Sequence, residues 1–206
     1  MNSRDALRAA PHRHADTDPD NSGQVTLAER AGPADDDLAA GLALRIGFVR
    51  RDLGDLEAAQ AHFRRSRELF EKIGRRAGQA QALAFDGWVT LHLGRQSEAV
   101  ELARASVALA EGPAQIAGLV TLGVALSVMG SPEEALEHHR RAFELLEPLA
   151  EVQLEIDCLH AYAETCRAAG RYDEALALLD RTIALARELG RPYDEKLVRA
   201  AQAVMR

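Results

Sequence analysis

Three titratable or charged side chains stand at helical spacing in the last third of the sequence: His160, Glu164 and Arg167. Residues three or four apart share one face of a helix, so these three could together orient a proton transfer. The same spacing also describes a solvent-exposed ion pair with a histidine beside it, and no nucleophile stands where it would complete a catalytic set. We therefore expect the ion pair, and we expect the protein not to be an enzyme.

Histidines and cysteines offer a second kind of chemistry, metal binding or thiol chemistry. The paired histidines are His12, His14, His138 and His139. Neither pair has a second cluster at ligand spacing, so a solvated surface explains them better than a metal site. Cys158 and Cys166 lie about 12 Å apart along one predicted helix, too far for a disulfide between them. We expect two buried thiols in a cytoplasmic protein.

Oxygen-bearing side chains recur along residues 18–29, DPDNSGQVTLAE. This segment resembles the calcium loop of the EF-hand family position by position. The resemblance implies that Gly23 permits the sharp turn and that oxygen atoms hold a calcium ion. The implied ligands are Asp18, Asp20, Ser22, the backbone carbonyl of Gln24, and Glu29.

The flanks of this loop favour a different interpretation. Pro11 interrupts the incoming helix, Gly32–Pro33 ends the outgoing one early, and no second hand is present to pair with the first. An acidic segment of low hydrophobicity can instead remain flexible. We therefore predict that residues 1–37 form an acidic, largely flexible arm, and calcium binding by the arm stays an open alternative.

The elements that would position all these residues are predicted by an internal period. Glycines stand at 54, 94, 130 and 170, with spacings of 40, 36 and 40 residues. A small residue precedes each glycine by seven positions, and an alanine follows each by five. Small residues let two helices approach closely, and a glycine can end a helix in the left-handed conformation. The period therefore predicts four helical hairpins, each burying its apolar face against the next.

Each hairpin consists of a first helix, A, and a second helix, B. The predicted A helices are Leu42–Leu53, Ala80–Leu93, Ile116–Met129 and Leu154–Ala169. The predicted B helices are Glu57–Ile73, Glu98–Glu111, Pro132–Leu146 and Asp173–Leu189. Pro148 should end or kink its helix, and residues 191–206 have the helical apolar spacing of a capping helix.

The repeated set of small residue, glycine, alanine and a second small residue resembles the tetratricopeptide repeat, most closely in LGRQSEAVELARASVAL and AGRYDEALALLDRTIAL. The 40-residue length is similar to repeats of bacterial regulators of the maltose-activator type and of kinesin light chains. The resemblance implies an all-α, right-handed superhelical solenoid of about four repeats within residues 38–195, plus the capping helix. The repeats would be residues 40–79, 80–115, 116–155 and 156–195. The chain departs from the motif where a tyrosine is usual, at Arg50, Thr90, Leu126 and Cys166.

In such arrays the A helices line the concave face, which implies a groove with an apolar middle and one charged wall. The expected groove residues are Phe48, Arg51, Phe85, Trp88, Leu91, His92, Val120, Val124, His160, Glu164 and Arg167. Trp88, the only tryptophan, would anchor a peptide or amphipathic helix, or would instead pack against its neighbouring repeat.

The net charge of −7 argues against nucleic acid, because affinity for nucleic acid depends on neutralising phosphates. No apolar run is long enough to span a membrane. We expect an interaction module, an adaptor, scaffold or sensor, that binds a peptide, an amphipathic helix or a small apolar ligand. The alternative is a regulatory component of a bacterial transcription or signalling system, with calcium response and homodimerisation left open.

Overall fold

The computed structural model describes residues 33–188 and residue 190, and all the regular structure in that part is helical. The α-helices are α2 (Pro33–Asp52), α3 (Leu56–Lys72), α4 (Arg76–His92), α5 (Gln96–Leu109), α6 (Ile116–Val128), α7 (Pro132–Leu146), α8 (Val152–Ala168) and α9 (Tyr172–Glu188). Two short 3-10 helices, Gly112–Gln115 and Glu147–Leu149, follow α5 and α7. The predicted all-α class is confirmed.

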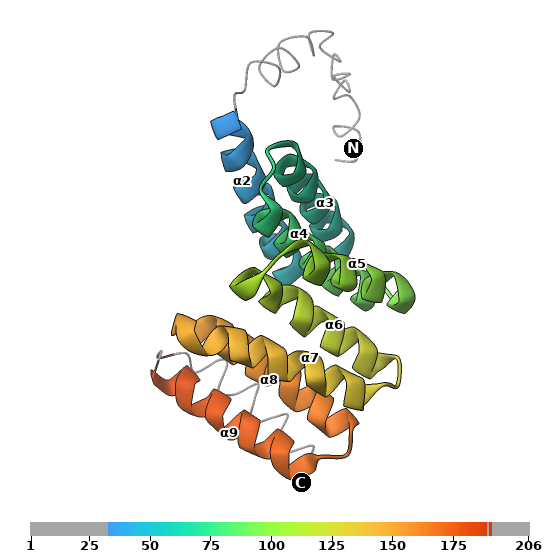
Figure 1. Ribbon diagram of the computed structural model, residues 1–206, viewed down its shortest axis with the longest axis vertical. Helices are drawn as coiled ribbons and strands as arrows, with labels where there is room; N and C mark the ends of the chain where they lie inside the picture. The colour runs from blue at the N-terminus through green and yellow to red at the C-terminus, as the bar shows by residue number, and fades with distance from the viewer. Residues whose placement is uncertain (1–32, 189, 191–206) are drawn as a thin grey trace, which may run out of the picture. The chain divides into compact units, whose positions relative to one another are not determined.

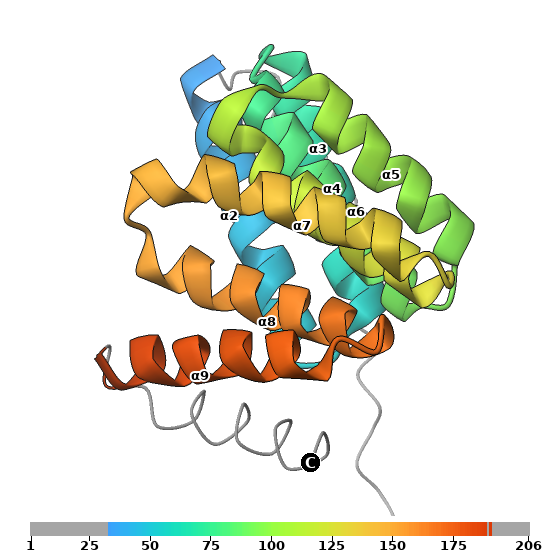
Figure 2. The ribbon, with the colours of Figure 1, turned by 60° about the horizontal axis from the view of Figure 1, so that its bottom comes forward.

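The helices form four hairpins, α2 with α3, α4 with α5, α6 with α7, and α8 with α9 (Figure 1). Successive hairpins stack, because α4 contacts α6 and α6 contacts α8. At the end of the stack, α8 lies between α7 and α9 (Figure 2). This is the helical solenoid that the period predicts, with α2, α4, α6 and α8 as the A helices.

The first helix begins earlier than the sequence suggested, at Pro33 instead of Leu42. The boundary at residue 37 was therefore wrong, because residues 33–37 belong to α2. Proline suits the first turn of a helix, and Asp35 and Asp36 complement the positive end of the helix dipole. Two ion pairs hold this turn in place: Lys72, the last residue of α3, pairs with Asp36 at 2.8 Å, and Arg75, directly before α4, pairs with Asp37 at 3.0 Å.

The repeated glycines end the A helices as predicted. Gly54, Gly94, Gly130 and Gly170 all have φ between 73° and 86°. The residue after each glycine donates its backbone N–H to a carbonyl in the last turn of the helix, as Asp55 does to Arg50 at 2.9 Å. This left-handed closure turns the chain sharply into the B helix.

Small residues bring the two helices of each hairpin into contact. A Cβ atom built on Gly47 would lie 2.6 Å from the ring of Phe63, and one on Gly123 would lie 2.6 Å from Nε2 of His139. The alanines five positions after the turn glycines are fully buried. They are Ala59, Ala99, Ala135 and Ala175. The prediction of close helix approach is confirmed.

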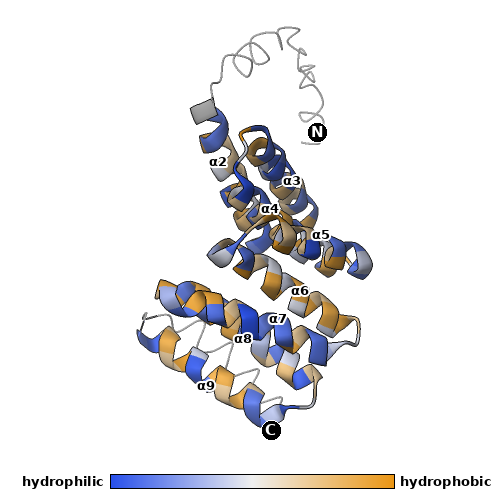
Figure 3. Cartoon of the chain, viewed as in Figure 1, coloured by the Kyte–Doolittle hydropathy of each residue, from blue (hydrophilic) through white to orange (hydrophobic). Residues whose placement is uncertain are grey.

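Apolar residues follow the interfaces between helices and fill much of α6, which carries no charged residue (Figure 3). Helix α6 lies against α4, α7 and α8, so it is the central A helix of the stack. The outward side of α2 exposes Leu38, Leu42 and Val49. Within residues 33–188, no helix is long and apolar enough to cross a bilayer.

Candidate functional site

All four A helices contribute to one groove with a cavity of about 390 Å³. Arg51 comes from α2, and Phe85 and Trp88 come from α4. Helix α6 contributes an apolar floor, and α8 contributes a polar rim. The floor includes Ala117, Val120 and Val124, and the rim includes Gln153, Asp157 and His160. A cavity of this size, lined mainly by apolar groups with a few polar ones, is typical of binding sites.

Trp88 is held in one orientation at the wall of this groove. The His92 ring stacks on the indole, with ring centroids 3.6 Å apart and the planes 25° from parallel. A ring nitrogen of His92 lies 2.8 Å from the carbonyl oxygen of Trp88, which fixes the histidine in turn. The Arg51 guanidinium lies 5.6 Å from the indole centroid and 5.1 Å from the Phe48 ring centroid. A fixed side chain loses little further freedom when a ligand binds.

Trp88 packs against the neighbouring repeat, as one of the two expectations had it, and whether it anchors a ligand stays a prediction. The side chain is half-buried, it packs against the core cluster of the first two hairpins, and it also lines the groove. The indole therefore has one part packed in the core and another part facing the cavity, and the core contacts hold the side chain in position.

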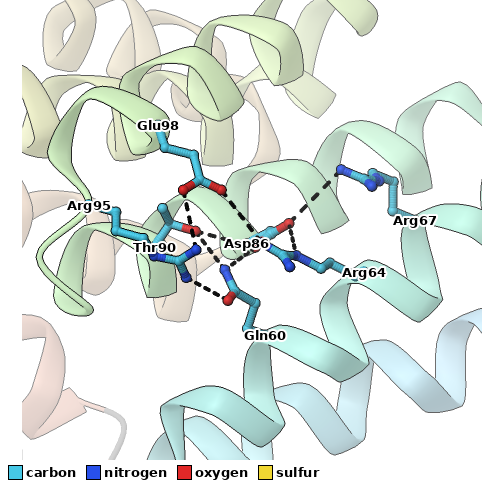
Figure 4. Close-up of polar contacts among 7 residues, drawn as sticks. All are labelled: Gln60, Arg64, Arg67, Asp86, Thr90, Arg95 and Glu98. Carbon is cyan, nitrogen blue, oxygen red and sulfur yellow. Dashed lines mark hydrogen bonds and ion pairs between the residues drawn. The ribbon is translucent and has the colours of Figure 1, made fainter.

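A network of polar side chains holds α4 against α3 and α5 (Figure 4). Asp86 is only 1% exposed, and it accepts hydrogen bonds from Gln60 at 2.7 Å and Arg64 at 3.3 Å. Gln60 also donates to Thr90 at 2.7 Å and accepts from Arg95 at 2.6 Å. Because Asp86 and Thr90 flank Trp88 along α4, this network fixes the helix that presents the indole.

Five expected groove residues lie outside the cavity lining, and three of them come from α2 and α4. Leu91 is 7% exposed and packs with Leu122 in the core, so its placement in the groove was wrong. Phe48 packs edge-on against Phe63 and Phe85, with ring centroids 5.5 and 4.5 Å away, and is outside the cavity lining. His92 contacts Trp88 and is outside the cavity lining.

Only one of the three residues predicted for the charged wall lines the cavity. His160 does so, and it is exposed. Glu164 and Arg167 pair with each other at 2.9 Å, both partly exposed to solvent and outside the lining. The ion pair expected as the alternative to a catalytic set is therefore present.

Gln153 and Asp157 of the polar rim on α8 were missed because the groove crosses the A helices diagonally. Arg51 lies three residues before its turn glycine, Trp88 lies six before, Val120 lies ten before and Asp157 lies thirteen before. The sequence prediction took the same positions from each repeat, so it did not include this shift of the lining residues along the helices. One signal was available, because Asp157 and Gln153 lie three and seven residues before His160 on the same helix face.

His139 corrects the expectation of a solvated histidine pair, because its side chain is completely buried. Its Nε2 lies 2.9 Å from Oγ1 of Thr165, and its ring stacks on Tyr162 with centroids 5.4 Å apart. Burial lowers the pKa of His139 to about 4, and the charge of His138 adds to this effect. Neutral imidazole therefore fills a core position here.

The two cysteines are buried thiols, as expected. Burial raises the pKa of Cys158 to about 12 and that of Cys166 to about 12. Within the part of the chain that the structure describes, no group of three or more His, Cys, Asp or Glu side chains could hold a metal ion. The candidate calcium loop at residues 18–29, His12, His14 and the predicted capping helix at 191–206 lie outside that part.

The repeats match a known family over most of their length. A family profile described as "Tetratricopeptide repeat" matches residues 38–112 and 115–188. The chain belongs to the tetratricopeptide repeat family. No curated protein matches the chain.

Solved structures share the tetratricopeptide fold at low sequence identity. A Rap protein complexed with Competence and Sporulation Factor has a TM-score of 0.69 and 14% identity, covering 88% of this chain and 51% of that one. BtubC (BKLC) from P. vanneervenii has a TM-score of 0.59 and 15% identity, with coverage of 82% and 71%. A putative kinesin light chain from Podosopora anserina, with nearly identical TPR-like repeats, has a TM-score of 0.53 and 18% identity, with coverage of 82% and 83%. This chain spans about half the length of the Rap protein chain.

Proposed function

We propose that this tetratricopeptide protein is an interaction module without catalytic activity, and that its groove holds a peptide or an amphipathic helix of a protein partner. The observation that carries the proposal is the apolar floor on α6 beside an indole held by Arg51 and His92. Apolar grooves with a fixed aromatic residue favour binding of extended or helical peptides. The relative solved in complex with a factor supports this class of function.

Selection from a displayed library of random peptides tests the proposal directly. We expect selected peptides to change the emission of Trp88, because it is the only tryptophan and lies at the groove wall. A Val124→Lys variant should lose about tenfold or more in affinity, since it introduces a charge into the apolar floor. Val128→Lys is the matched control on the same helix, because Val128 is 53% exposed and outside the lining.

Two results would contradict this assignment. One is a library that yields no binder to the folded protein. The other is equal affinity in the parent, Val124→Lys and Trp88→Ala proteins, with circular dichroism showing that all three are folded. Tyr172→Ala, an exposed aromatic truncation on α9, should leave peptide binding unchanged.

A second candidate is a regulatory role in a bacterial signalling or transcription system. It is favoured by the Rap protein and by aspartyl phosphate phosphatase F from Bacillus subtilis, which has a TM-score of 0.60, 13% identity, and coverage of 76% of this chain and 42% of that one. Genes for a regulator or a biosynthetic cluster beside this one would support it, whereas genes for chaperones or secretion would support plain scaffolding. For either role we propose a cytoplasmic protein that acts on protein partners and on neither nucleic acid nor membranes, which the acidic net charge supports.

Calcium response would be an addition to either role. It is favoured by the oxygen-bearing pattern from Asp18 to Glu29. Calorimetric titration of calcium into the full chain and into a Glu29→Gln variant distinguishes the outcomes. Binding heat in the parent that the variant loses would support a calcium site, and identical heats would eliminate it.

A further inference from the structure

Among the described residues that line the groove, Arg51 is the only lysine or arginine. Its guanidinium carbon lies 5.1 Å from the ring centroid of Phe48, in the first repeat, and 5.6 Å from that of Trp88, in the second. No other repeat supplies a lining residue at this position, three before the turn glycine. The equivalent residues are Leu91, Ser127 and Arg167. The guanidinium is therefore a single feature of the groove, and it lies beside the indole.

Asp52 holds one edge of this guanidinium. Its Oδ1 accepts a hydrogen bond from Nε of Arg51 at 2.9 Å and lies 2.7 Å from Nη2. Nη1 makes no hydrogen bond with any described residue. The side chain of Asp52 is 65% exposed and that of Arg51 is 30% exposed, so water screens the pair and makes it weak. A guanidinium has five N–H donors in one plane, and those of Nη1 stay available to a ligand.

A carboxylate is the ligand group that fits this arrangement. A planar guanidinium binds a carboxylate through charge-assisted hydrogen bonds, which are stronger than those between neutral groups. The rings of Phe48 and Trp88 and the carboxylate of Asp52 already restrict the Arg51 side chain, so little further freedom is lost on binding. The indole beside the guanidinium offers an apolar surface to the neighbouring residue of the same ligand.

We propose that the groove selects peptides in which an aspartate or glutamate lies next to an apolar residue. The acidic side chain binds the guanidinium of Arg51 at Nη1, and the apolar side chain packs on Trp88. Asp52 is a positioning residue, which holds the guanidinium against the two rings and whose negative charge moderates the affinity for the ligand. The inference rests on the function proposed above and adds the chemistry of the partner.

The test uses the displayed library of random peptides and the full chain. Selection is run in parallel on the parent protein, on Arg51→Gln and on Arg50→Gln. Arg50 is the matched control, because it is the adjacent arginine, pairs with Asp55 at 3.5 Å and lies outside the lining. Selected peptides of about twelve residues are then made with capped ends, so that every carboxylate belongs to a side chain. A derivative of each has its acidic residue replaced by glutamine or asparagine, and calorimetry measures all affinities.

We expect aspartate or glutamate beside an apolar residue to be enriched on the parent and on Arg50→Gln, and not on Arg51→Gln. The acidic peptide should lose about three- to tenfold in affinity on Arg51→Gln, whereas its amide derivative should lose much less. Arg51→Lys, which keeps the charge, should retain part of the affinity. Asp52→Asn should bind the acidic peptide more tightly than the parent does and the amide derivative equally well.

Two kinds of failure are distinguishable. If no peptide binds the folded parent protein, the proposed function is overturned together with this inference. If peptides bind without enrichment of acidic residues, or if Arg51→Gln weakens the acidic peptide and its amide derivative by the same factor, the groove remains a peptide site but its selection of a carboxylate is overturned. Circular dichroism of each variant shows that it is folded.

Discussion

His139 should make this protein less stable as the pH falls. Its imidazole is completely buried between α7 and α8. The hydroxyl of Thr165 donates to the carbonyl of Ala161 at 3.2 Å, so it is left to accept a hydrogen bond from N–H at Nε2 of His139. The lone pair is then on Nδ1, which has no hydrogen-bond partner in the described part of the chain. Protonation would place an N–H group where nothing described accepts it.

The sign and size of the effect follow from the pKa. In the unfolded chain a histidine titrates near 6.5, whereas the pKa of folded His139 is lowered to about 4. Between these values the unfolded state binds a proton that the folded state does not, so the free energy of unfolding falls as the pH falls below about 6.5. Between pH 7 and pH 4.5 the loss is about 2 kcal/mol, a large part of the stability of a typical domain.

Urea denaturation followed by circular dichroism at both pH values measures this loss. Other groups also titrate in this range, so the decisive comparison is with a His139→Leu variant, which places leucine where the fourth repeat has Leu179. The pH-dependent loss should shrink by about 2 kcal/mol in His139→Leu. Equal losses in the parent and in His139→Leu would refute the reasoning.

Three further predictions concern thiols, the polar junction and helix contact. Cys158 and Cys166 should not react with a thiol reagent at pH 8 until urea unfolds the chain, because burial raises the pKa of each to about 12; fast native labelling would contradict this. Asp86→Ala should lower the free energy of unfolding by about 3 kcal/mol, since it leaves buried polar partners unsatisfied, and a change in Tm near zero would be the contrary result. Gly123→Ala should destabilise by about 1–3 kcal/mol, because its Cβ would lie 2.6 Å from an imidazole nitrogen. Gly41→Ala, whose Cβ would meet nothing within 4 Å, should stabilise by about 0.5–1 kcal/mol, and equal effects at the two glycines would show that contact is not the cause.

The hairpins could be predicted from the sequence because their geometry depends on local rules. A turn glycine needs a left-handed backbone, and a close helix pair needs small side chains, so four copies of both fix four hairpins. The start of α2 was missed because three consecutive aspartates suggest a flexible arm, although carboxylates at a helix N-terminus are stabilising.

The floor of the groove could also be predicted, whereas Gln153 and Asp157 of its polar rim could not. Val120 and Val124 follow from the repeat register, since α6 is central and apolar. Asp157 depends on how far each hairpin rotates relative to the previous one, and that rotation is set by the packing of particular side chains between helices. The spacing of residues within one repeat therefore does not predict this rotation.

Two buried polar residues, Asp86 and His139, stand at positions that are apolar in the other repeats. Asp86 stands eight residues before its turn glycine, where the other repeats have Ile46, Leu122 and Tyr162. His139 stands nine residues after its glycine, in the position of Phe63. A polar residue at a position that is apolar in the other copies is therefore expected to be buried, and it must find its partners on a neighbouring helix.

Buried polar residues also help to select the order in which similar hairpins stack. Asp86 is satisfied by Gln60 and Arg64 from the preceding hairpin, and His139 contacts Thr165 of the following one. An apolar hairpin face can pack against many other apolar faces with a similar free energy. A buried carboxylate or imidazole instead needs a hydrogen-bond partner at one particular place. A wrong neighbour would leave these groups without partners, at a cost of about 1–3 kcal/mol each. The polar junctions therefore contribute less to net stability than to the selection of one order of hairpins, and it is this order that brings residues of all four A helices to one groove.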